Sequence, residues 1–250
     1  MTSGSAVVLE SYNDLAAASA VQQRFMQHRN RALETVRYDA QCRQLCELGG
    51  DCYDFIPLPD GRLAFAIADA SGKGLAAALA ILGLQSSLRT AVAFTDGDPR
   101  TVVSAVNRQV HASSVAGRYA TLFFGVFDEA TCTLRYVNAG HNPPIIIGRG
   151  GSIVHLDAGG LPVGLFADLS YTEAVAQLYP GDLIVAYTDG VTEATNHHDE
   201  EFGIERLIQA AIHNARPGAE KVVQAVFEYM DRFTGGRQND DATVLVLQIP

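Results

Sequence analysis

Two aspartates at the ends of a predicted β-hairpin are the residues of this chain best placed to do chemistry. Asp51 precedes the strand-like run 52–56, and Asp69 follows a second run, 62–68, with a Pro- and Gly-containing turn between them. If the two runs pair antiparallel, Asp51 and Asp69 converge at one end of the sheet. Two carboxylates in one pocket repel each other unless they take up a proton or a cation, and their hard oxygen atoms suit Mg²⁺ or Mn²⁺.

Two further aspartates lie at other predicted strand ends. Asp189 closely follows the run 182–187, and Asp240 shortly precedes the run 242–249. Four acidic side chains from distant parts of the chain could therefore meet at one edge of the sheets. Because aspartates at strand ends usually cap turns, a turn function is the alternative to a metal site at each position.

Six segments resemble, in order, the bacterial branch of the metal-dependent PP2C-type (PPM) serine/threonine phosphatases. They are 47–55 (ELGGDCYDF), 68–74 (ADASGKG), 138–144 (NAGHNPP), 161–164 (LPVG), 187–194 (YTDGVTEA) and 239–243 (NDDAT). The resemblance runs from roughly Tyr38 to the C-terminus and points to the sporulation and stress-response regulators of the SpoIIE/RsbU type. It is specific, because several separate motifs would have to coincide by chance.

The resemblance implies a site for two Mn²⁺ or Mg²⁺ ions. Asp69, Asp189 and Asp240 resemble the ligands of one ion. Asp51, Asp69 and the backbone carbonyl of Ala70 resemble those around the other, so Asp69 would bridge. Two ions about 3.5–4 Å apart can bind a shared water, lower its pKa and align it with the phosphorus of a phosphoester. The protein would then need no nucleophile of its own.

Three further residues are candidates to support these ligands. Asp241 and Glu193 could tune the aspartate cluster, although a solvated turn explains each equally well. His141 could protonate the leaving serine oxygen, but bracing of its own loop is the preferred interpretation. The chain shows no clear counterpart of the phosphate-binding arginine of some eukaryotic relatives. Asp54, next to the aspartate pair, is expected to face solvent.

Composition favours one folded domain, and its charge gives mild support for a polypeptide over a nucleic acid as substrate. The chain has 250 residues without an evident linker, is 48% hydrophobic and only 18% charged, and carries a net charge of −10. That charge disfavours nucleic acid and anionic membranes as partners. The longest apolar run, 75–84, is about half of the ~20 residues that a membrane-spanning helix needs, and no secretory signal is visible, so a cytoplasmic protein is expected.

The four cysteines are expected to be free thiols in a reducing compartment. Cys42, Cys46 and Cys52 cluster in the sequence. They lack a CxxC pair and following paired histidines, so zinc binding is the lesser alternative.

Hydrophobic periodicity favours an N-terminal helical segment, 1–35, and the resemblance implies a PP2C-like phosphatase domain, 36–250. The first helix is expected from Asn13 to about Thr35, and it either packs on its own domain or serves as a signalling helix or a homodimer contact. Later helices are predicted at 73–93 (capped by Ser71), 98–113, 203–214 and 217–233. Strands are predicted at 119–127, 133–137, 144–148, 152–156, 171–178, 182–187 and 242–249.

Strands grouped apart from helices indicate an α+β domain. Helical stripes and alternating strands require two covered sheets, which suits the four-layer α/β/β/α sandwich that the resemblance implies, with two mainly antiparallel sheets flanked by helices. Short connections between successive strands support the antiparallel pairing.

Other phosphatase chemistries lack their signatures. No cysteine has an arginine six positions downstream, and the Asp-x-Asp at 96–98 lies between predicted helices. The primary hypothesis is a phosphatase for phosphoserine or phosphothreonine, whose substrate, by resemblance, is a small phosphorylated regulator such as an anti-sigma-factor antagonist. The alternatives are a catalytically weak phosphoprotein-binding module and, disfavoured by the acidity, a metal-dependent phosphodiesterase.

Overall fold

The computed structural model describes residues 3–26, 36–114, 117–215 and 218–250, with only the backbone described for residues 3–12. The helices are α1 (Ser3–Met26), α2 (Leu75–Thr95), α3 (Pro99–Ser113), α4 (Asp189–Thr192), α5 (Gly203–His213) and α6 (Ala219–Thr234). The strands are β1 (Arg37–Arg43), β2 (Asp51–Pro57), β3 (Arg62–Ala70), β4 (Ala120–Asp128), β5 (Thr133–Ala139), β6 (Ile145–Ile147), β7 (Ile153–His155), β8 (Gly159–Gly160), β9 (Ala174–Gln177), β10 (Leu183–Tyr187) and β11 (Ala242–Gln248).

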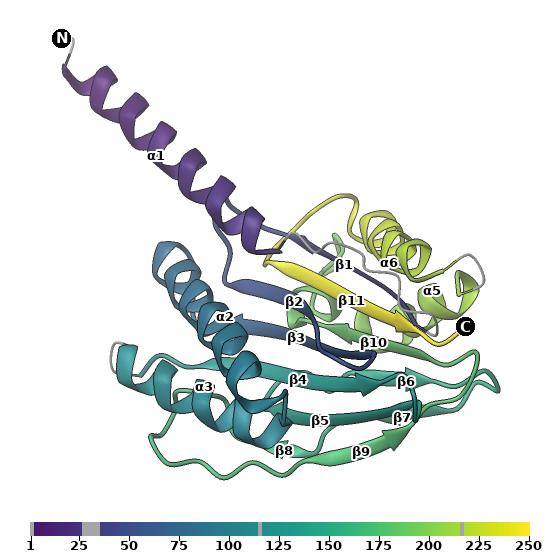
Figure 1. Ribbon diagram of the computed structural model, residues 1–250. Coiled ribbons are helices and arrows are strands. Elements are labelled where there is room, and N and C mark those ends of the chain that lie inside the picture. Colours follow the sequence, from purple (N-terminus) through teal and green to yellow (C-terminus); the bar gives the residue numbers. More distant parts are fainter. Residues whose placement is uncertain (1–2, 27–35, 115–116, 216–217) are drawn as a thin grey trace.

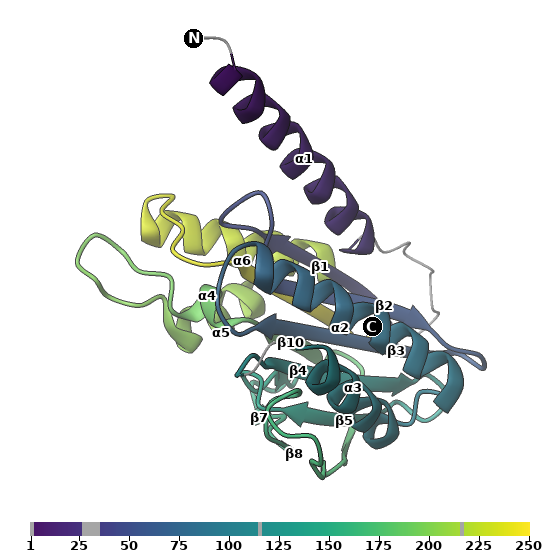
Figure 2. The same cartoon turned by 90° about the vertical axis from the view of Figure 1, so that its left-hand side faces the viewer.

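The strands form two sheets that pack face to face, and helices cover both outer faces (Figures 1 and 2). One sheet has the order β1-β11-β10-β6-β7, and the other has β2-β3-β4-β5-β8 with β9 paired to β5. All strand pairs are antiparallel except β5 with β8. The predicted α+β class and α/β/β/α sandwich are therefore confirmed.

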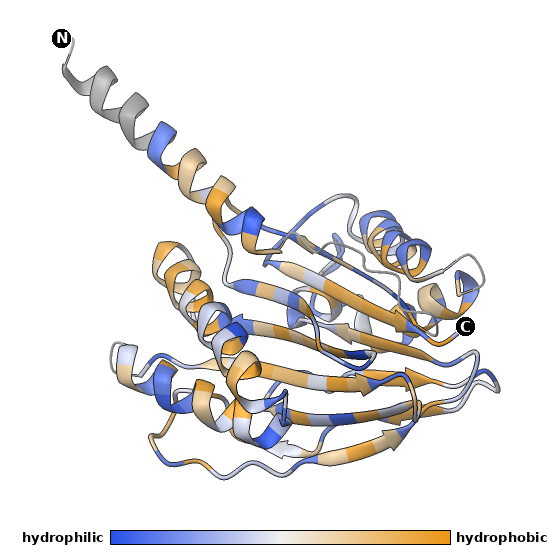
Figure 3. Ribbon diagram, in the orientation of Figure 1, coloured by the Kyte–Doolittle hydropathy of each residue, from blue (hydrophilic) through white to orange (hydrophobic). Residues whose placement is uncertain are grey.

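Three apolar cores hold the four layers together. One lies between α2–α3 and their sheet, one between the two sheets, and one between α5–α6 and the other sheet. Figure 3 shows apolar residues concentrated along the strands of both sheets. Strand β3 shows how alternation builds two cores at once, because Leu63, Phe65 and Ile67 face the opposite sheet while its intervening alanines lie under α2. The small alanines let the helix approach closely.

The hairpin of β2 and β3 forms as predicted. Its register pairs Asp51 with Asp69 and Pro57 with Leu63, so the two aspartates are direct cross-strand partners. Asp60 and Gly61 both adopt positive φ in the turn, which glycine accepts freely and aspartate tolerates. The convergence of the first two aspartates therefore follows from local turn chemistry.

Helix α1 differs from the sequence expectation at its start. It begins at Ser3 rather than near Asn13, and it projects away from the sandwich so that only its C-terminal end meets the other layers (Figures 1 and 2). Between residues 13 and 26, only Gln22 and Met26 are buried. The predicted continuation to Thr35 lies outside the described residues.

Helix α2 is not capped by Ser71. Its N-cap is Gly74, and the Ser71 hydroxyl instead accepts a hydrogen bond from the Tyr119 amide at 3.0 Å. The helix is long and apolar enough, by length and composition, to cross a membrane. Its inner face, including Ile81 and Leu84, packs into the core beneath it, as in a core helix of a folded domain.

Of two expectations about individual side chains, the one for Asp54 is wrong and the one for the cysteines is confirmed. Asp54 does not face solvent: it is 4% exposed and receives two hydrogen bonds from the Arg89 guanidinium. The four cysteines are free thiols, as expected, and burial raises the pKa of Cys42 and of Cys52.

Candidate metal centre

Side-chain alternation aims the first two candidate aspartates into the space between the sheets. On β3, Asp69 continues the series Leu63, Phe65, Ile67, and on β2, Asp51 continues the series of Tyr53 and Phe55; both series face the opposite sheet. The same period on β11 and β10 directs Thr243 and Thr188 toward them. Carboxylates of one sheet and hydroxyls of the other therefore meet at the end of the inter-sheet core.

Asp51 is the anchored member of the pair. It is 2% exposed, and its Oδ2 accepts hydrogen bonds from the hydroxyls of Thr188 at 2.8 Å and Thr243 at 2.6 Å. The Thr188 hydroxyl also accepts a hydrogen bond from the Thr243 backbone amide. These contacts fix one oxygen of the Asp51 carboxylate, and the Asp51 side chain also hydrogen-bonds to Asp69.

Burial and mutual repulsion disfavour the ionised forms of both Asp51 and Asp69. Burial raises the pKa of Asp51 well above its ordinary value, and the charge of Asp69 adds to this effect while the two threonine hydroxyls oppose it. Burial also raises the pKa of Asp69 to about 7, with further contributions from Asp189, Asp240 and Asp241. The pair therefore retains a proton near neutral pH unless a cation replaces it.

Gly190 has no side chain, and this allows the backbone next to Asp189 to approach the backbone next to Asp240 closely. Asp189 is the first residue of α4, and a Cβ on Gly190 would overlap the carbonyl oxygen of Asp241. This close approach brings α4 against the segment that leads into β11. Burial raises the pKa of Asp189, and the charge of Asp240 raises it further, so these two carboxylates also repel each other.

Both oxygens of Asp240 already have partners. Oδ1 accepts the Asp241 backbone amide at 2.9 Å, and Oδ2 lies 2.5 Å from the Lys73 ammonium. Lys73 also donates to the Asn239 carbonyl at 3.2 Å. This lysine thus ties the loop before α2 to the segment before β11.

Asp241 acts on the turn before Asp51 rather than facing solvent. Its Oδ2 accepts the Gly50 amide at 2.6 Å and its Oδ1 accepts the Leu45 amide at 2.7 Å. The Gly50 carbonyl in turn accepts the Ala70 amide at 3.0 Å. The backbone around Ala70, whose carbonyl is the expected ligand, is therefore coupled to Asp51 through Gly50.

These residues fit divalent ions by donor type and by charge. The donors are carboxylate and carbonyl oxygens, which Mg²⁺ and Mn²⁺ prefer, and a dication would relieve the repulsion that raises the pKa values. Within the described ranges, no three Asp, Glu, His or Cys side chains are yet gathered at the spacing of a finished metal site.

His141 is built into its loop. It is buried, its Nδ1 lies 2.8 Å from the Thr121 hydroxyl, and its backbone amide and carbonyl both hydrogen-bond to the Asn138 side chain. Burial lowers the pKa of His141 to about 4, and the backbone of Tyr187 opposes this effect. A neutral, enclosed imidazole is suited to bracing rather than to donating a proton at pH 7.

Glu193 lies at the periphery of the cluster. Its side chain is exposed, burial is the main cause that raises its pKa, and the charge of Asp189 is the next. The charge of the cluster therefore affects the pKa of Glu193, although its side chain is not enclosed in the site.

Sequence reasoning missed Thr188, Thr243, Lys73 and Gln22. The two threonines adjoin or nearly adjoin the candidate aspartates Asp189 and Asp240 in the sequence, so their position was a usable signal. Lys73 contacts Asp240, and the Gln22 side-chain amide donates to the Gly49 carbonyl at 2.7 Å, so both join segments that only the tertiary fold brings together.

Comparison with known proteins gives the family. Residues 59–250 match the family described as Stage II sporulation protein E (SpoIIE). The chain belongs to the SpoIIE family. It is a PP2C-like domain of the branch that contains RsbU and SpoIIE, as the motifs predicted.

Two curated relatives are similar to most of this chain, but the chain spans only part of their length. The chain is 28% identical over 94% of its length to Protein IcfG of Synechocystis sp. and 27% identical over 81% to phosphoserine phosphatase RsbU of Bacillus subtilis. It spans 41% and 60% of the lengths of these relatives.

Among solved structures, the SiaA-PP2C domain of Pseudomonas aeruginosa has the same fold. The TM-score is 0.83 at 19% identity, with 98% of each chain covered. The coverage includes nearly all of the present chain.

Proposed function

We propose that this protein is a Mn²⁺- or Mg²⁺-dependent phosphatase that hydrolyses phosphoserine or phosphothreonine in a protein. The observation that carries the proposal is the convergence on Asp69. Asp51 is its cross-strand partner, and the charges of Asp189 and Asp240 contribute to the raised pKa of Asp69. Three aspartates from three other segments therefore influence Asp69, which supports a shared site.

The proposed ligands divide between two ions. Asp69, Asp189 and Asp240 would hold one, and Asp51, Asp69 and the Ala70 carbonyl would hold the other. Bound divalent ions supply a water of lowered pKa and neutralise charge on the phosphoryl group. The protein's own contribution is to orient the ligands: Thr188 and Thr243 hold Asp51, and Asp241 holds the preceding turn.

The proposed substrate is a small phosphorylated regulatory protein such as an anti-sigma-factor antagonist. RsbU, the relative with 27% identity, bears the name phosphoserine phosphatase, which supports a phosphoserine protein as substrate. The net charge of −10 disfavours nucleic acid and anionic membranes. The cytoplasm is the expected compartment, and a homodimer through α1 stays a prediction.

Hydrolysis of a phosphoserine peptide, with and without Mn²⁺, tests the proposal. We expect activity to require the ion and to fall in Asp69→Asn by more than the ~10–100-fold that loss of an outer hydrogen-bond partner of a ligand typically costs. Asp168→Asn, an exposed aspartate outside the site, is the matched control. Equal rates in metal-stripped and Mn²⁺-loaded protein, or an unimpaired Asp69→Asn variant, would contradict the proposal.

The same assay separates the two alternatives. A binding module with this fold would bind a phosphoprotein without turnover. A phosphodiesterase would prefer bis(p-nitrophenyl) phosphate to p-nitrophenyl phosphate, whereas we expect the monoester to be preferred.

A further inference from the structure

Three large apolar side chains are exposed on loops beside the proposed metal centre. Leu161 is 50% exposed, Phe166 is 55% exposed and Tyr119 is 37% exposed. Leu161 and Phe166 belong to the segment 161–167 between β8 and β9, and Tyr119 immediately precedes β4. Apolar groups that stay exposed close together commonly mark an interaction surface. The backbone contacts of the two segments bring these three side chains to one region.

The segment 161–167 lies two strand spacings from Ala70, whose carbonyl is a proposed metal ligand. Val163 exchanges two backbone hydrogen bonds of 2.9 Å with Ala120, and Ala120 is the cross-strand partner of Ala70. Because neighbouring strands are about 4.8 Å apart, Val163 lies about 10 Å from Ala70. Tyr119 adjoins Ala120, so it lies beside the same segment.

The side chain of Asn107 in α3 holds the segment in place. Asn107 is 1% exposed, and its Oδ1 accepts the Gly164 amide at 2.8 Å. Its Nδ2 donates to the carbonyls of Phe166 and Ala167, each at 3.0 Å. One turn further along α3, Nδ1 of His111 lies 3.0 Å from the Gly164 carbonyl oxygen. These backbone groups are therefore paired with α3, while the Phe166 side chain remains exposed.

The other end of the segment is fixed by close packing. Leu161 precedes Pro162, and the Pro162 ring occupies the space that a Cβ on Gly140 would need. A partner that must order a flexible loop loses free energy on binding, and a loop that is already ordered avoids this cost. The exposed side chains of Leu161 and Phe166 are therefore presented on a backbone that is prepared for binding.

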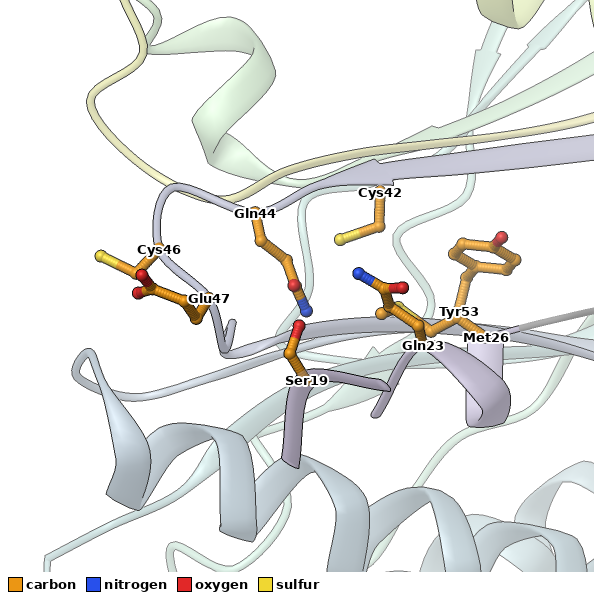
Figure 4. Close-up of a pocket in the computed structure, with 8 residues that line it drawn as sticks. All are labelled: Ser19, Gln23, Met26, Cys42, Gln44, Cys46, Glu47 and Tyr53. Carbon is orange, nitrogen blue, oxygen red and sulfur yellow. The ribbon is translucent and has the colours of Figure 1, made fainter. Parts of the chain in front are cut away.

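The opposite side of the proposed centre has a different character. Asp51 lies on β2, at the edge of its sheet, and beside β2 is a cavity of about 650 Å³ that α1 and β1 also line. Figure 4 shows several polar side chains at this cavity, namely Ser19, Gln23, Gln44 and Glu47. A protein bound at the centre would therefore meet polar groups on the side of β2 and apolar groups on the side of β4.

We infer that Leu161, Phe166 and Tyr119 form a docking surface for the protein substrate, which selects phosphoserine segments with an apolar side chain near the phosphoserine. The inference rests on the proposed phosphatase function. An extended chain advances about 3.3 Å per residue, so a span of about 10 Å corresponds to about three residues. The selected apolar residue is therefore expected about three positions from the phosphoserine.

Hydrolysis of short phosphoserine peptides by the full chain with Mn²⁺ tests the inference. The peptides carry leucine or glutamine three positions before or three positions after the phosphoserine and are otherwise identical. We expect one of the two leucine peptides to have a KM about tenfold below that of its glutamine counterpart, which corresponds to about 1.4 kcal/mol. The value of kcat should stay similar, because the added contact is made equally in the ground state and the transition state.

Variants of the docking surface should lose this preference. Leu161→Gln and Phe166→Gln should each raise KM for the preferred leucine peptide toward that of its glutamine counterpart. Both should hydrolyse p-nitrophenyl phosphate, which has no flanking residues, within about twofold of the wild-type rate. Val175→Gln and Tyr179→Gln are the matched controls, because these side chains are 63% and 62% exposed outside the surface, and both variants should keep the preference.

Three results would overturn the inference. Equal kcat/KM for leucine and glutamine peptides would do so, as would a leucine preference that survives both Leu161→Gln and Phe166→Gln. Self-association that Phe166→Gln abolishes, with unchanged peptide kinetics, would assign the surface to a second copy of the chain. All three leave the phosphatase function standing if wild type hydrolyses p-nitrophenyl phosphate with Mn²⁺. Wild-type protein that hydrolyses neither this ester nor any peptide would overturn both proposals.

Discussion

The ammonium group of Lys73 lies 2.5 Å from Oδ2 of Asp240, so a cation supplied by the chain pairs with a carboxylate expected to ligate a metal ion. The pair is partly exposed, with 62% of the Lys73 side chain accessible, and such pairs contribute only about 0–1 kcal/mol. An incoming dication must nevertheless displace this ammonium or share the carboxylate with it.

Replacement of Lys73 by glutamine should therefore strengthen Mn²⁺ binding. We expect an increase of up to about fivefold, the equivalent of about 1 kcal/mol, in calorimetric titrations at low ionic strength. Lys221→Gln removes the same charge from an exposed position on α6 and should leave the affinity unchanged. Weaker binding by Lys73→Gln would show instead that the lysine organises the site.

Loss of the Thr243 hydroxyl should impair ion binding more than it impairs folding. The Thr243 and Thr188 hydroxyls lower the pKa of Asp51 against the effect of burial, so they stabilise its ionised form, which is the form that binds a cation. A hydrogen bond to a charged group contributes about 1.5–3 kcal/mol, so Thr243→Val should weaken Mn²⁺ binding at least about tenfold. Thr133→Val, on an exposed pair of hydroxyls, is the control. A similar loss in both variants would contradict this role.

Any side chain at position 190 should disrupt the site. A Cβ there would overlap the Asp241 carbonyl, so Gly190→Ala must push α4 away from the segment that carries Asp240. We expect loss of Mn²⁺ binding and a lower melting temperature. Gly83→Ala, in an α2 position with no atom within 4 Å of the added Cβ, should instead stabilise the protein by about 0.5–1 kcal/mol. If Gly190→Ala retained its Mn²⁺ affinity, the position of α4 would not matter for ion binding, and the prediction would be wrong.

Stabilisation by Mn²⁺ should grow with pH up to about 7. Burial raises the folded-state pKa of Asp69 to about 7, so in the metal-free protein its favourable contribution is complete below about 3.8 and is lost as pH rises through about 7; the pKa of Asp51 is raised as well, chiefly by burial. Ion binding requires the ionised carboxylates and so releases protons over the same range. Melting temperatures with and without Mn²⁺ between pH 5 and 8 should diverge in wild type and much less in Asp69→Asn. A divergence independent of pH would contradict the shared proton.

His141 should act in the opposite direction on acidification. Its folded-state pKa of about 4 lies below the ordinary 6.5, so its contribution is present above pH 6.5 and is lost as pH falls toward 4. At 1.36 kcal/mol per pKa unit, this amounts to about 3 kcal/mol. Chemical denaturation at pH 7 and 4.5 should show a smaller loss of unfolding free energy in His141→Asn. An equal loss in both proteins would contradict a buried neutral imidazole.

The sequence by itself determined the hairpin that pairs Asp51 with Asp69, the α+β class and the ordered motifs of the family. Turn residues and the two-residue alternation of strands are local properties, so they can be interpreted without coordinates. Local pattern also placed most strands and helices to within a few residues. It failed at Asp54, whose partner Arg89 is 35 positions away, and at the start of α1.

Only the tertiary structure decided which contacts surround the proposed metal centre. Thr243 reaches Asp51 across 192 positions of sequence, Asp241 reaches Gly50 across 191, and Gln22 reaches Gly49 from a helix that local pattern could assign equally to a dimer. These contacts depend on how two sheets and a helix pack. The alternation of side chains along a strand shows which face of the sheet a residue lies on, but not which residues pack against that face. The proposed ligands can therefore be predicted from their own segments, whereas the hydrogen bonds that orient them cannot.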